Sequence, residues 1–148
     1  APCGPGASVR TYVLDTSVAV AWYLPERFAR AARTWQRKLL ENRVRLLVPA
    51  LHFWEIGNVL RTYVRRAELD SALAQEVYAL HLDAPLEVIE PERGDVLATA
   101  LEMDATMYDA VFIALARRHG VPLLTAERKT TPWVVRLGRL VEPVGGKA

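Results

Sequence analysis

The sequence predicts a three-layer α/β sandwich, with helices on both faces of a mostly parallel sheet of four or five strands. Short apolar runs alternate along the chain with longer segments whose apolar residues recur every three or four positions. This alternation predicts helical crossovers between neighbouring strands, and such crossovers join parallel strands. With 148 residues, of which 51% are hydrophobic and 24% charged, the chain is long enough to bury one substantial core.

Three elements are predicted in the first 42 residues. Residues 9–14 form an apolar, partly β-branched run that stops at Asp15, as a strand does where a helix cap follows. Residues 17–24 predict a short buried helix, which Pro25 ends. Residues 26–42 carry apolar side chains at spacings of three and four, which predicts an amphipathic helix.

The middle of the chain predicts one strand and two helices. Residues 45–48 form a second apolar run of strand length, closed by a proline. Residues 52–66 predict a helix that carries aromatic and aliphatic side chains at helical spacing. A further helix is predicted at 70–82, with Asp70 or Ser71 as its N-cap.

The last third of the chain continues the alternation. Helices are predicted at 92–103 and 108–119, and the second of them ends at Gly120, the residue type that commonly closes a helix. Further strands are predicted at 86–89 and 121–124, with an edge strand at 140–141. The segment between Thr125 and this edge strand shows no clear pattern.

We expect a single domain over residues 9–144, after a disordered or processing-derived lead-in at 1–8 and before a tail at 145–148. The one cysteine, Cys3, lies in the lead-in, so an intrachain disulfide is excluded, which suits a reducing cytoplasm. No apolar run approaches the roughly 20 residues that span a bilayer. We therefore expect a cytoplasmic protein without membrane contact.

Four acidic residues occupy positions that favour ligand binding. Asp15 directly follows the first strand, and Glu127 lies three residues beyond the strand at 121–124. In an open parallel sheet, ligands bind beyond the carboxyl ends of the strands. Glu55 and Asp109 lie on helices between apolar neighbours, where a charge is costly unless it is paired, hydrogen-bonded or bound to a cation.

Each acid also has a purely structural interpretation. Asp15 could cap the first helix, and Asp109 could complete a capping box that starts at Thr106. Glu127 could be a solvated first-turn residue, and Glu55 could belong to an exposed stripe. Asp104, five residues before Asp109, could add a fifth acid or could be an ordinary loop residue.

The combination of acids is more informative than any single one. No cluster of Lys or Arg lies beside them in sequence, and carboxylates that repel one another stay ionised together only when a cation neutralises them. Oxygen ligands select Mg²⁺ or Mn²⁺ over zinc. A site of this kind is suited to phosphodiester hydrolysis.

Four motifs occur in the order and approximate spacing of the PIN-domain ribonucleases: LDTSV at 14–18, EIGNVL at 55–60, YDA at 108–110 and LLTAE at 123–127. From about Val9 to Val144 the chain resembles in particular the VapC-type toxins of toxin–antitoxin pairs. The resemblance implies Mg²⁺- or Mn²⁺-dependent hydrolysis of RNA that leaves 5′-phosphate and 3′-hydroxyl ends. It also implies a homodimer and an antitoxin protein that covers the acidic groove.

The resemblance assigns roles residue by residue. Asp15, Glu55 and Asp109 match the metal-binding acids of the family, and Ser17, Asn58 and Thr125 match polar positions that orient those acids or contact the metal's water. The family usually has Asp at the position of Glu127. The longer Glu127 could reach a second metal position or turn into solvent, so the number of metal ions stays open, although Glu127 is counted here with the catalytic and metal-binding residues.

Other enzyme classes fit less well. A haloacid-dehalogenase-type phosphatase needs a second acid where Ser17 stands, and the acidic pair and phosphoacceptor of a receiver domain are missing. Gly-rich nucleotide-binding loops are also missing. The competing hypothesis is a PIN-like domain that no longer cleaves and only binds RNA or a protein. The altered fourth acid, Glu127, favours this competitor, and metal-dependent cleavage that Asp109→Asn abolishes would exclude it.

Aromatic residues near the chain start predict a partner surface. Trp22, Tyr23, Phe28 and Trp35 lie in two neighbouring helices, and exposed aromatic patches commonly mark interfaces, although burial inside the monomer is the alternative. Trp54 and Trp133 are interpreted as core or interface anchors. The three histidines are dispersed without metal-ligand spacing. Arg27, Arg30, Arg33 and Arg37 are interpreted as a solvated helix face or as RNA-phosphate contacts. A second basic group could flank the active groove: Arg61, Arg65 and Arg66.

Overall fold

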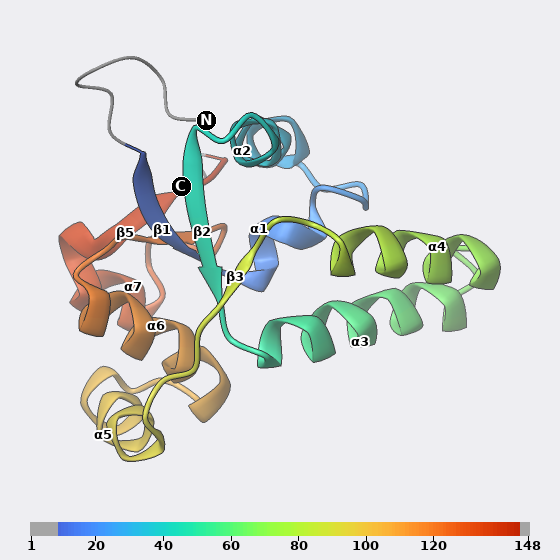
Figure 1. The fold of residues 1–148 in the computed structure, drawn as a ribbon. Coiled ribbons are helices and arrows are strands. Elements are labelled where there is room, and N and C mark those ends of the chain that lie inside the picture. The colour runs from blue at the N-terminus through green and yellow to red at the C-terminus, as the bar shows by residue number, and fades with distance from the viewer. Residues whose placement is uncertain (1–8, 146–148) are drawn as a thin grey trace.

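A computed structural model describes residues 9–145, so the lead-in predicted at 1–8 and residues 146–148 of the predicted tail lie outside the described residues. Within 9–145, five strands form one sheet in the order β3-β2-β1-β4-β5, and all neighbouring strands are parallel. Helices cover both faces of this sheet (Figure 1). The predicted α/β sandwich is confirmed, and its sheet is entirely rather than mostly parallel.

The element bounds follow the predicted order. The strands are β1 (Arg10–Leu14), β2 (Val44–Val48), β3 (Glu87–Val88), β4 (Leu123–Thr125) and β5 (Val141–Pro143). The helices are α1 (Thr16–Val20), α2 (Ala29–Leu40), α3 (Leu51–Arg65), α4 (Ser71–Leu82), α5 (Arg93–Met103), α6 (Met107–His119) and α7 (Pro132–Leu137), and a 3₁₀ turn, η1 (Gly138–Leu140), follows α7.

Alternating side chains of the central strands build a core on each face of the sheet. In β1, Tyr12 and Leu14 pack with α1, α2 and α3, whereas Val13 points to the other face and packs with α6 and α7. In β4, Leu124 and Leu123 divide between the same two cores. Strands buried on both faces explain why the sequence shows continuous apolar runs rather than alternation.

Two helix predictions needed correction, and one helix was not predicted. The helix predicted at 17–24 ends at Val20 and continues as turns, and the helix predicted at 26–42 begins only at Ala29. Pro25 lies in the turns between the two helices, where it cannot donate a backbone hydrogen bond and restricts the residue before it. The segment after Thr125 contains α7, which the sequence analysis did not predict.

The prediction of an exposed aromatic surface near the chain start is wrong. Trp22 is buried and donates its indole N–H to the carbonyl of Ala32 at 2.9 Å. Trp35 packs edge-on against Tyr12, with ring centroids 4.8 Å apart. Tyr23 and Phe28 are half-buried against the same core. These rings join α1 and α2 to the sheet, so they give no support to a dimer surface.

Helices α3 and α4 form a pair that projects from the side of the sheet, whereas α5, α6 and α7 lie on its other side (Figure 1). Asp70 caps α4, as predicted, and accepts from the backbone N–H groups of Ala72 and Leu73. Among residues 9–145, no helix has both the length and the apolar character needed to cross a bilayer.

Candidate active site

Asp15 lies between two neighbouring strands. It follows β1, and its backbone N–H donates to the carbonyl of Leu124 in β4 at 2.9 Å. Its carboxylate oxygen Oδ2 accepts from the hydroxyl of Ser17 at 2.9 Å and from that of Thr125 at 2.7 Å. Although Asp15 holds the N-cap position of α1, its side chain makes no capping hydrogen bond. Its carboxylate is therefore held for something other than helix capping.

Glu55 lies on α3 and is half-buried. Its Oε1 accepts from the hydroxyl of Thr16 at 2.7 Å. Burial raises the pKa of the Glu55 carboxyl most, the Thr16 hydrogen bond lowers it, and repulsion from Asp15 and Asp109 raises it further. The side chain is therefore anchored inside the fold rather than part of an exposed stripe.

Asp109 lies in the first turn of α6, where the side chain of Thr106 caps the helix by accepting from the Asp109 backbone N–H at 3.1 Å. The Thr106 half of the predicted capping box is thus present. Burial raises the pKa of the Asp109 carboxyl most, and repulsion from Glu127 adds to the rise. Hydrogen bonds from Thr106 and from Trp133 of α7 act in the opposite direction.

Glu127 lies in the loop after β4 and is exposed. Its backbone N–H donates to the Thr125 hydroxyl at 3.0 Å, and this hydroxyl in turn donates to Asp15. Its Oε1 accepts from the Arg128 backbone N–H at 3.2 Å and from the Thr131 hydroxyl at 3.3 Å. The side chain thus stays on its own loop, while its charge still acts on Asp15 and Asp109.

The four acids form one electrostatic cluster at the carboxyl ends of the strands. Burial raises the pKa of Asp15 most, and repulsion from Asp109 and Glu127 contributes after the opposing hydrogen bonds. Within residues 9–145, no group of three or more His, Cys, Asp or Glu side chains is arranged so that it could coordinate one metal ion. The donor chemistry nevertheless fits a hard divalent cation, because the cluster offers only oxygen atoms and gathers negative charge.

The supporting residues divide into two groups. Ser17 and Thr125 both donate to Asp15, and Ser17 also accepts from the backbone N–H of Ala126 at 3.1 Å. Asn58, by contrast, is exposed on α3. Asp104 is exposed, closes α5 in a left-handed conformation with φ of 53°, and is not among the groups that shift the pKa of Asp15, Glu55 or Asp109. It is a loop residue, as the structural interpretation proposed.

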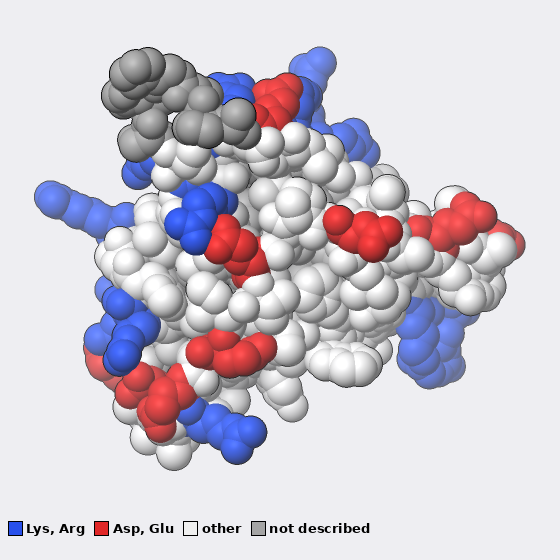
Figure 2. All heavy atoms as spheres, viewed as in Figure 1, with Lys and Arg blue, Asp and Glu red and all other residues white. Residues whose placement is uncertain are grey.

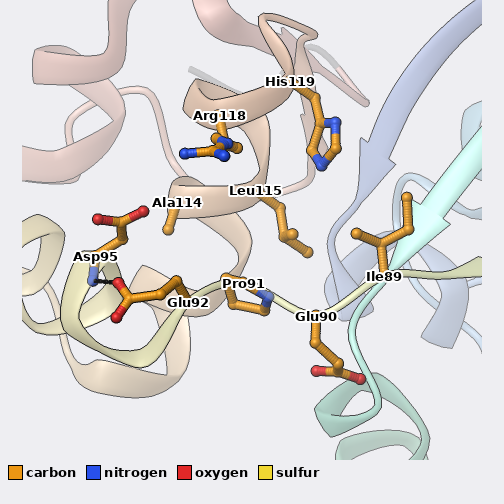
Figure 3. Close-up of a pocket in the computed structure, with 9 residues that line it drawn as sticks. All are labelled: Ile89, Glu90, Pro91, Glu92, Asp95, Ala114, Leu115, Arg118 and His119. Atoms are coloured by element: carbon orange, nitrogen blue, oxygen red, sulfur yellow. Dashed lines mark hydrogen bonds between the residues drawn. The ribbon is translucent and has the colours of Figure 1, made fainter.

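A cavity of about 510 Å³ lies apart from this cluster, between the segment that leads into α5 and the last turn of α6 (Figure 3). Two of its three acids already have structural partners. Glu90 accepts from the backbone N–H of Ala50 at 2.8 Å, and Glu92 caps α5 by accepting from Gly94 and Asp95. None of the four clustered acids is among the nine residues drawn there, so the cavity gives no support to the proposed chemistry.

Basic side chains gather at the outer end of α3 and α4, at the lower right of Figure 2. Arg61, Arg65 and Arg66 line a shallow hollow there, together with Thr62. Since Glu55 lies on the same helix, α3 carries an acid of the cluster in its first half and a basic surface near its end.

Four residues with a place in or behind the site were not singled out by the sequence analysis. Thr16 was quoted within a motif but given no role, yet it holds Glu55. Trp133 was interpreted as an anchor, and it is buried on α7 beside Asp109. His52 and His81 were set aside as dispersed, and both are completely buried and hydrogen-bonded behind Thr16. Only the LDTSV motif offered a sequence signal, and it pointed to Thr16.

Comparison with known families identifies the group to which this chain belongs. The family model described as PIN domain matches residues 12–130, which include all four acids. The chain belongs to the PIN-domain family. Ribonuclease VapC3 of Pyrobaculum aerophilum is 30% identical over 125 residues, covering 79% of this chain and 89% of that relative. Exonuclease VapC9 of the same organism is 29% identical over 92 residues, covering 62% and 69%. The chain is therefore a PIN-domain nuclease related to the VapC toxins.

Solved structures share the fold at low sequence identity. PAE2754 from Pyrobaculum aerophilum superposes with a TM-score of 0.69 at 23% identity, covering 94% of this chain and 93% of that one. VapBC2 from Rickettsia felis, bound to a DNA fragment from its promoter, gives a TM-score of 0.60 at 13% identity, covering 90% and 98%. A toxin–antitoxin complex from Klebsiella pneumoniae gives 0.52 at 14%, covering 81% and 88%. These likenesses confirm the PIN-like architecture.

Proposed function

We propose that this PIN-domain protein is an endoribonuclease that uses Mg²⁺ or Mn²⁺ and acts as the toxin of a VapBC-type pair. The observation that carries the proposal is the cluster of Asp15, Glu55, Asp109 and Glu127, in which burial and repulsion from neighbouring carboxylates raise the pKa values of Asp15, Glu55 and Asp109. Such repulsion destabilises the ionised cluster unless a cation neutralises it. A divalent ion bound there would activate water and stabilise the leaving oxygen of a phosphodiester.

The residues of the chain would supply the geometry for this chemistry. Asp15 is held by two hydroxyl donors and Glu55 by one, so both carboxylates are oriented before an ion arrives. Asp109 would complete the ligand set from the start of α6, and Glu127 would add negative charge from the loop beyond β4. Hydrolysis would leave a 5′-phosphate and a 3′-hydroxyl.

Two exposed aromatic residues favour a single-stranded substrate. Trp54 is 73% exposed and precedes Glu55, and Tyr108 is 64% exposed and precedes Asp109. The interpretation of Trp54 as a core anchor is therefore wrong. Exposed aromatic rings offer stacking platforms for unpaired bases, and the Arg61–Arg65–Arg66 surface offers phosphate contacts. We propose that single-stranded segments of RNA lie across α3 and α6 near the acids.

The toxin assignment adds an antitoxin protein and a homodimer as proposed partners. Relatives of the same fold include a toxin–antitoxin complex and a VapBC pair bound to promoter DNA. An Arg or Lys of the antitoxin would occupy the place of the cation, because the cluster attracts positive charge without supporting hydrolysis. Light scattering at micromolar concentration tests the dimer: a mass near 16.6 kDa for the free protein would exclude it.

The decisive experiment uses linear and covalently closed circular single-stranded RNA of the same sequence. An endonuclease opens the circle, whereas an exonuclease degrades only the linear form. We expect the circle to be opened with Mg²⁺ or Mn²⁺ and to stay intact with EDTA, and we expect the new 5′ ends to carry phosphate. Degradation of the linear RNA alone would overturn the endonuclease assignment.

Asp109→Asn and Asp104→Asn form a matched pair for this assay. Both remove one carboxylate, but only Asp109 belongs to the acid cluster. We expect cleavage to fall by at least 100-fold in Asp109→Asn and to stay at the wild-type level in Asp104→Asn. Thermal unfolding should show that Mn²⁺ stabilises the wild type more than Asp109→Asn, since only a bound ion shifts the folding equilibrium.

The alternative function is a domain that binds RNA or a protein without cleaving. It is favoured by Glu127, whose carboxylate is exposed and already accepts hydrogen bonds from Arg128 and Thr131 on its own loop. RNA binding without any metal-dependent cleavage of linear or circular RNA would select this alternative.

A further inference from the structure

A continuous line of hydrogen bonds runs from the acid cluster into the core on the α1–α4 side of the sheet. Thr16 donates to Glu55 at 2.7 Å and lies 3.0 Å from Nδ1 of His52. Nε2 of His52 lies 2.7 Å from Nε2 of His81, and Nδ1 of His81 lies 2.7 Å from the hydroxyl of Tyr23. These five side chains come from α1, the turn that follows it, α3 and α4.

Burial makes this line costly unless every group is paired. His52 and His81 are both 0% exposed, and aromatic rings of Trp22 and Phe53 pack against them. A buried polar group without a partner costs about 1–3 kcal/mol. Among the described residues, every fully buried side-chain nitrogen and oxygen has a hydrogen-bond partner.

Counting the available protons determines which partner donates in each hydrogen bond of this line. A carboxylate can only accept, so Thr16 must use its single hydroxyl proton toward Glu55. Thr16 can then only accept from His52, which must carry its proton on Nδ1. The unprotonated Nε2 of His52 must accept from Nε2–H of His81, and Nδ1 of His81 must accept from the Tyr23 hydroxyl. Four hydrogen bonds use four protons, and all of them point toward Glu55.

We propose that Tyr23, His81, His52 and Thr16 form a directed relay that positions Glu55, with His52 as the Nδ1–H tautomer and His81 as the Nε2–H tautomer. His52 donates a hydrogen bond to the Thr16 oxygen and thereby orients the Thr16 hydroxyl proton toward Oε1 of Glu55. The second oxygen of Glu55 remains available to a ligand. This role rests on the proposed function, since it assumes that Glu55 binds the divalent ion.

The charge states of the three titratable groups are consistent with this arrangement. Burial lowers the pKa of His52 to about 3 and that of His81 to about 4, so both rings are neutral at neutral pH. Burial raises the pKa of Tyr23 to about 12, so its hydroxyl keeps the proton that it donates. Each neutral imidazole then has one donor and one acceptor, which the count requires.

The first test is the tautomer of each ring, measured by ¹⁵N-correlated NMR of the metal-free protein at neutral pH. Protonated and unprotonated ring nitrogens have well-separated ¹⁵N shifts, and exposed His119 serves as an internal reference. We expect Nδ1–H at His52 and Nε2–H at His81. The opposite tautomer at either ring in the wild-type protein overturns the relay, whether or not the protein is a nuclease.

The second test removes the Thr16 hydroxyl, which accepts the hydrogen bond from His52 in the relay. Thr16→Val keeps the side-chain shape but has no hydroxyl, whereas Thr16→Ser keeps the hydroxyl. We expect the opposite tautomers to become populated at both His52 and His81 in Thr16→Val, because the hydrogen bond between the two rings couples their tautomers. In Thr16→Ser the opposite tautomers should stay absent. Unchanged tautomers at His81 in a folded Thr16→Val protein would show that the hydrogen bonds are independent and would overturn the relay.

The third test measures Mn²⁺ affinity by titration calorimetry. We expect Thr16→Val and His52→Leu to weaken Mn²⁺ binding by 10- to 100-fold, the usual range for groups that orient metal ligands. Thr16→Ser and His52→Asn should stay close to wild type, since an Asn amide can replace Nδ1–H as the donor to Thr16. Equal affinities in all four variants would overturn the positioning role, whereas a wild-type protein that binds no Mn²⁺ would instead overturn the proposed function.

Discussion

Acid should destabilise this protein through its two buried histidines. His52 and His81 have folded-state pKa values of about 3 and about 4, below the ordinary value of 6.5. Between these folded values and 6.5 the unfolded chain binds more protons than the folded chain, with the difference approaching two near pH 5, so the free energy of unfolding falls as pH falls. From pH 7 to pH 5, each histidine contributes a loss of about 2 kcal/mol, and the pair a loss of about 4 kcal/mol.

The clustered acids act with the opposite sign. The pKa values of Asp15, Glu55 and Asp109 are raised in the folded state, so their unfavourable ionisation is relieved as pH falls. The histidine contribution must therefore be isolated by comparison. The matched variant is His52→Asn with His81→Gln, which removes both imidazoles and keeps amide donors near their places.

Urea denaturation at pH 5, 6, 7 and 8 in EDTA measures this difference. The loss of unfolding free energy between pH 7 and pH 5 should be about 4 kcal/mol larger in the wild type than in the double variant. His119→Gln is the matched control, since it removes an exposed imidazole and leaves the buried pair in place. Parallel pH profiles for wild type and double variant would refute the conclusion that the pair is buried and neutral.

Four other substitutions test separate parts of the structure. Asp70→Ala removes the cap of α4 and should cost about 1 kcal/mol in urea denaturation without changing RNA cleavage. Gly120→Ala should cost about 1 kcal/mol by the same measurement, because φ is 62° there although no atom obstructs the new methyl group. Glu127→Gln should lower the pKa of Asp109 by removing repulsion, as followed by carboxyl ¹³C NMR. Trp54→Ala should raise KM for single-stranded RNA and leave kcat nearly unchanged, since it removes an exposed stacking surface.

Local signals in the sequence were sufficient for most of the fold. Apolar runs between turn residues located β1, β2 and β4, because strands buried on both faces are apolar almost throughout, and shorter runs indicated the edge strands β3 and β5. Asp70 and Gly120 correctly marked a helix start and a helix end. Helix α7 had a usable signal in Thr131 followed by proline at the first helical position, but the segment is short and carries little periodicity.

The errors arose where packing decides the outcome. The composition of α1 and α2 could not show that the indole of Trp22 donates to Ala32, which places this ring in the core. Trp54 shows the opposite outcome, because the fold leaves its side chain exposed on α3. Aromatic content locates large apolar surface, but only the tertiary arrangement determines whether that surface is covered.

The acids were found from sequence because each lies in a short local motif, whereas the groups that hold them are distant in the chain. Thr125 reaches Asp15 across 110 positions, and His81 reaches His52 across 29. No spacing rule predicts such contacts, since they depend on which strands are neighbours and on how α4 folds back along α3.

The hydrogen bonds also divide the four acids by how firmly they are held. Asp15 and Glu55 accept from hydroxyl groups that are themselves fixed by other contacts, so their orientation is set by the fold. Asp109 and Glu127 lie at the start of α6 and in a loop, and their mutual repulsion favours separation. An arriving cation would therefore find two oriented ligands and draw the other two inward. On this basis, substitutions at Thr16 and Thr125 should act on affinity through orientation, whereas substitutions at Glu127 should act through charge.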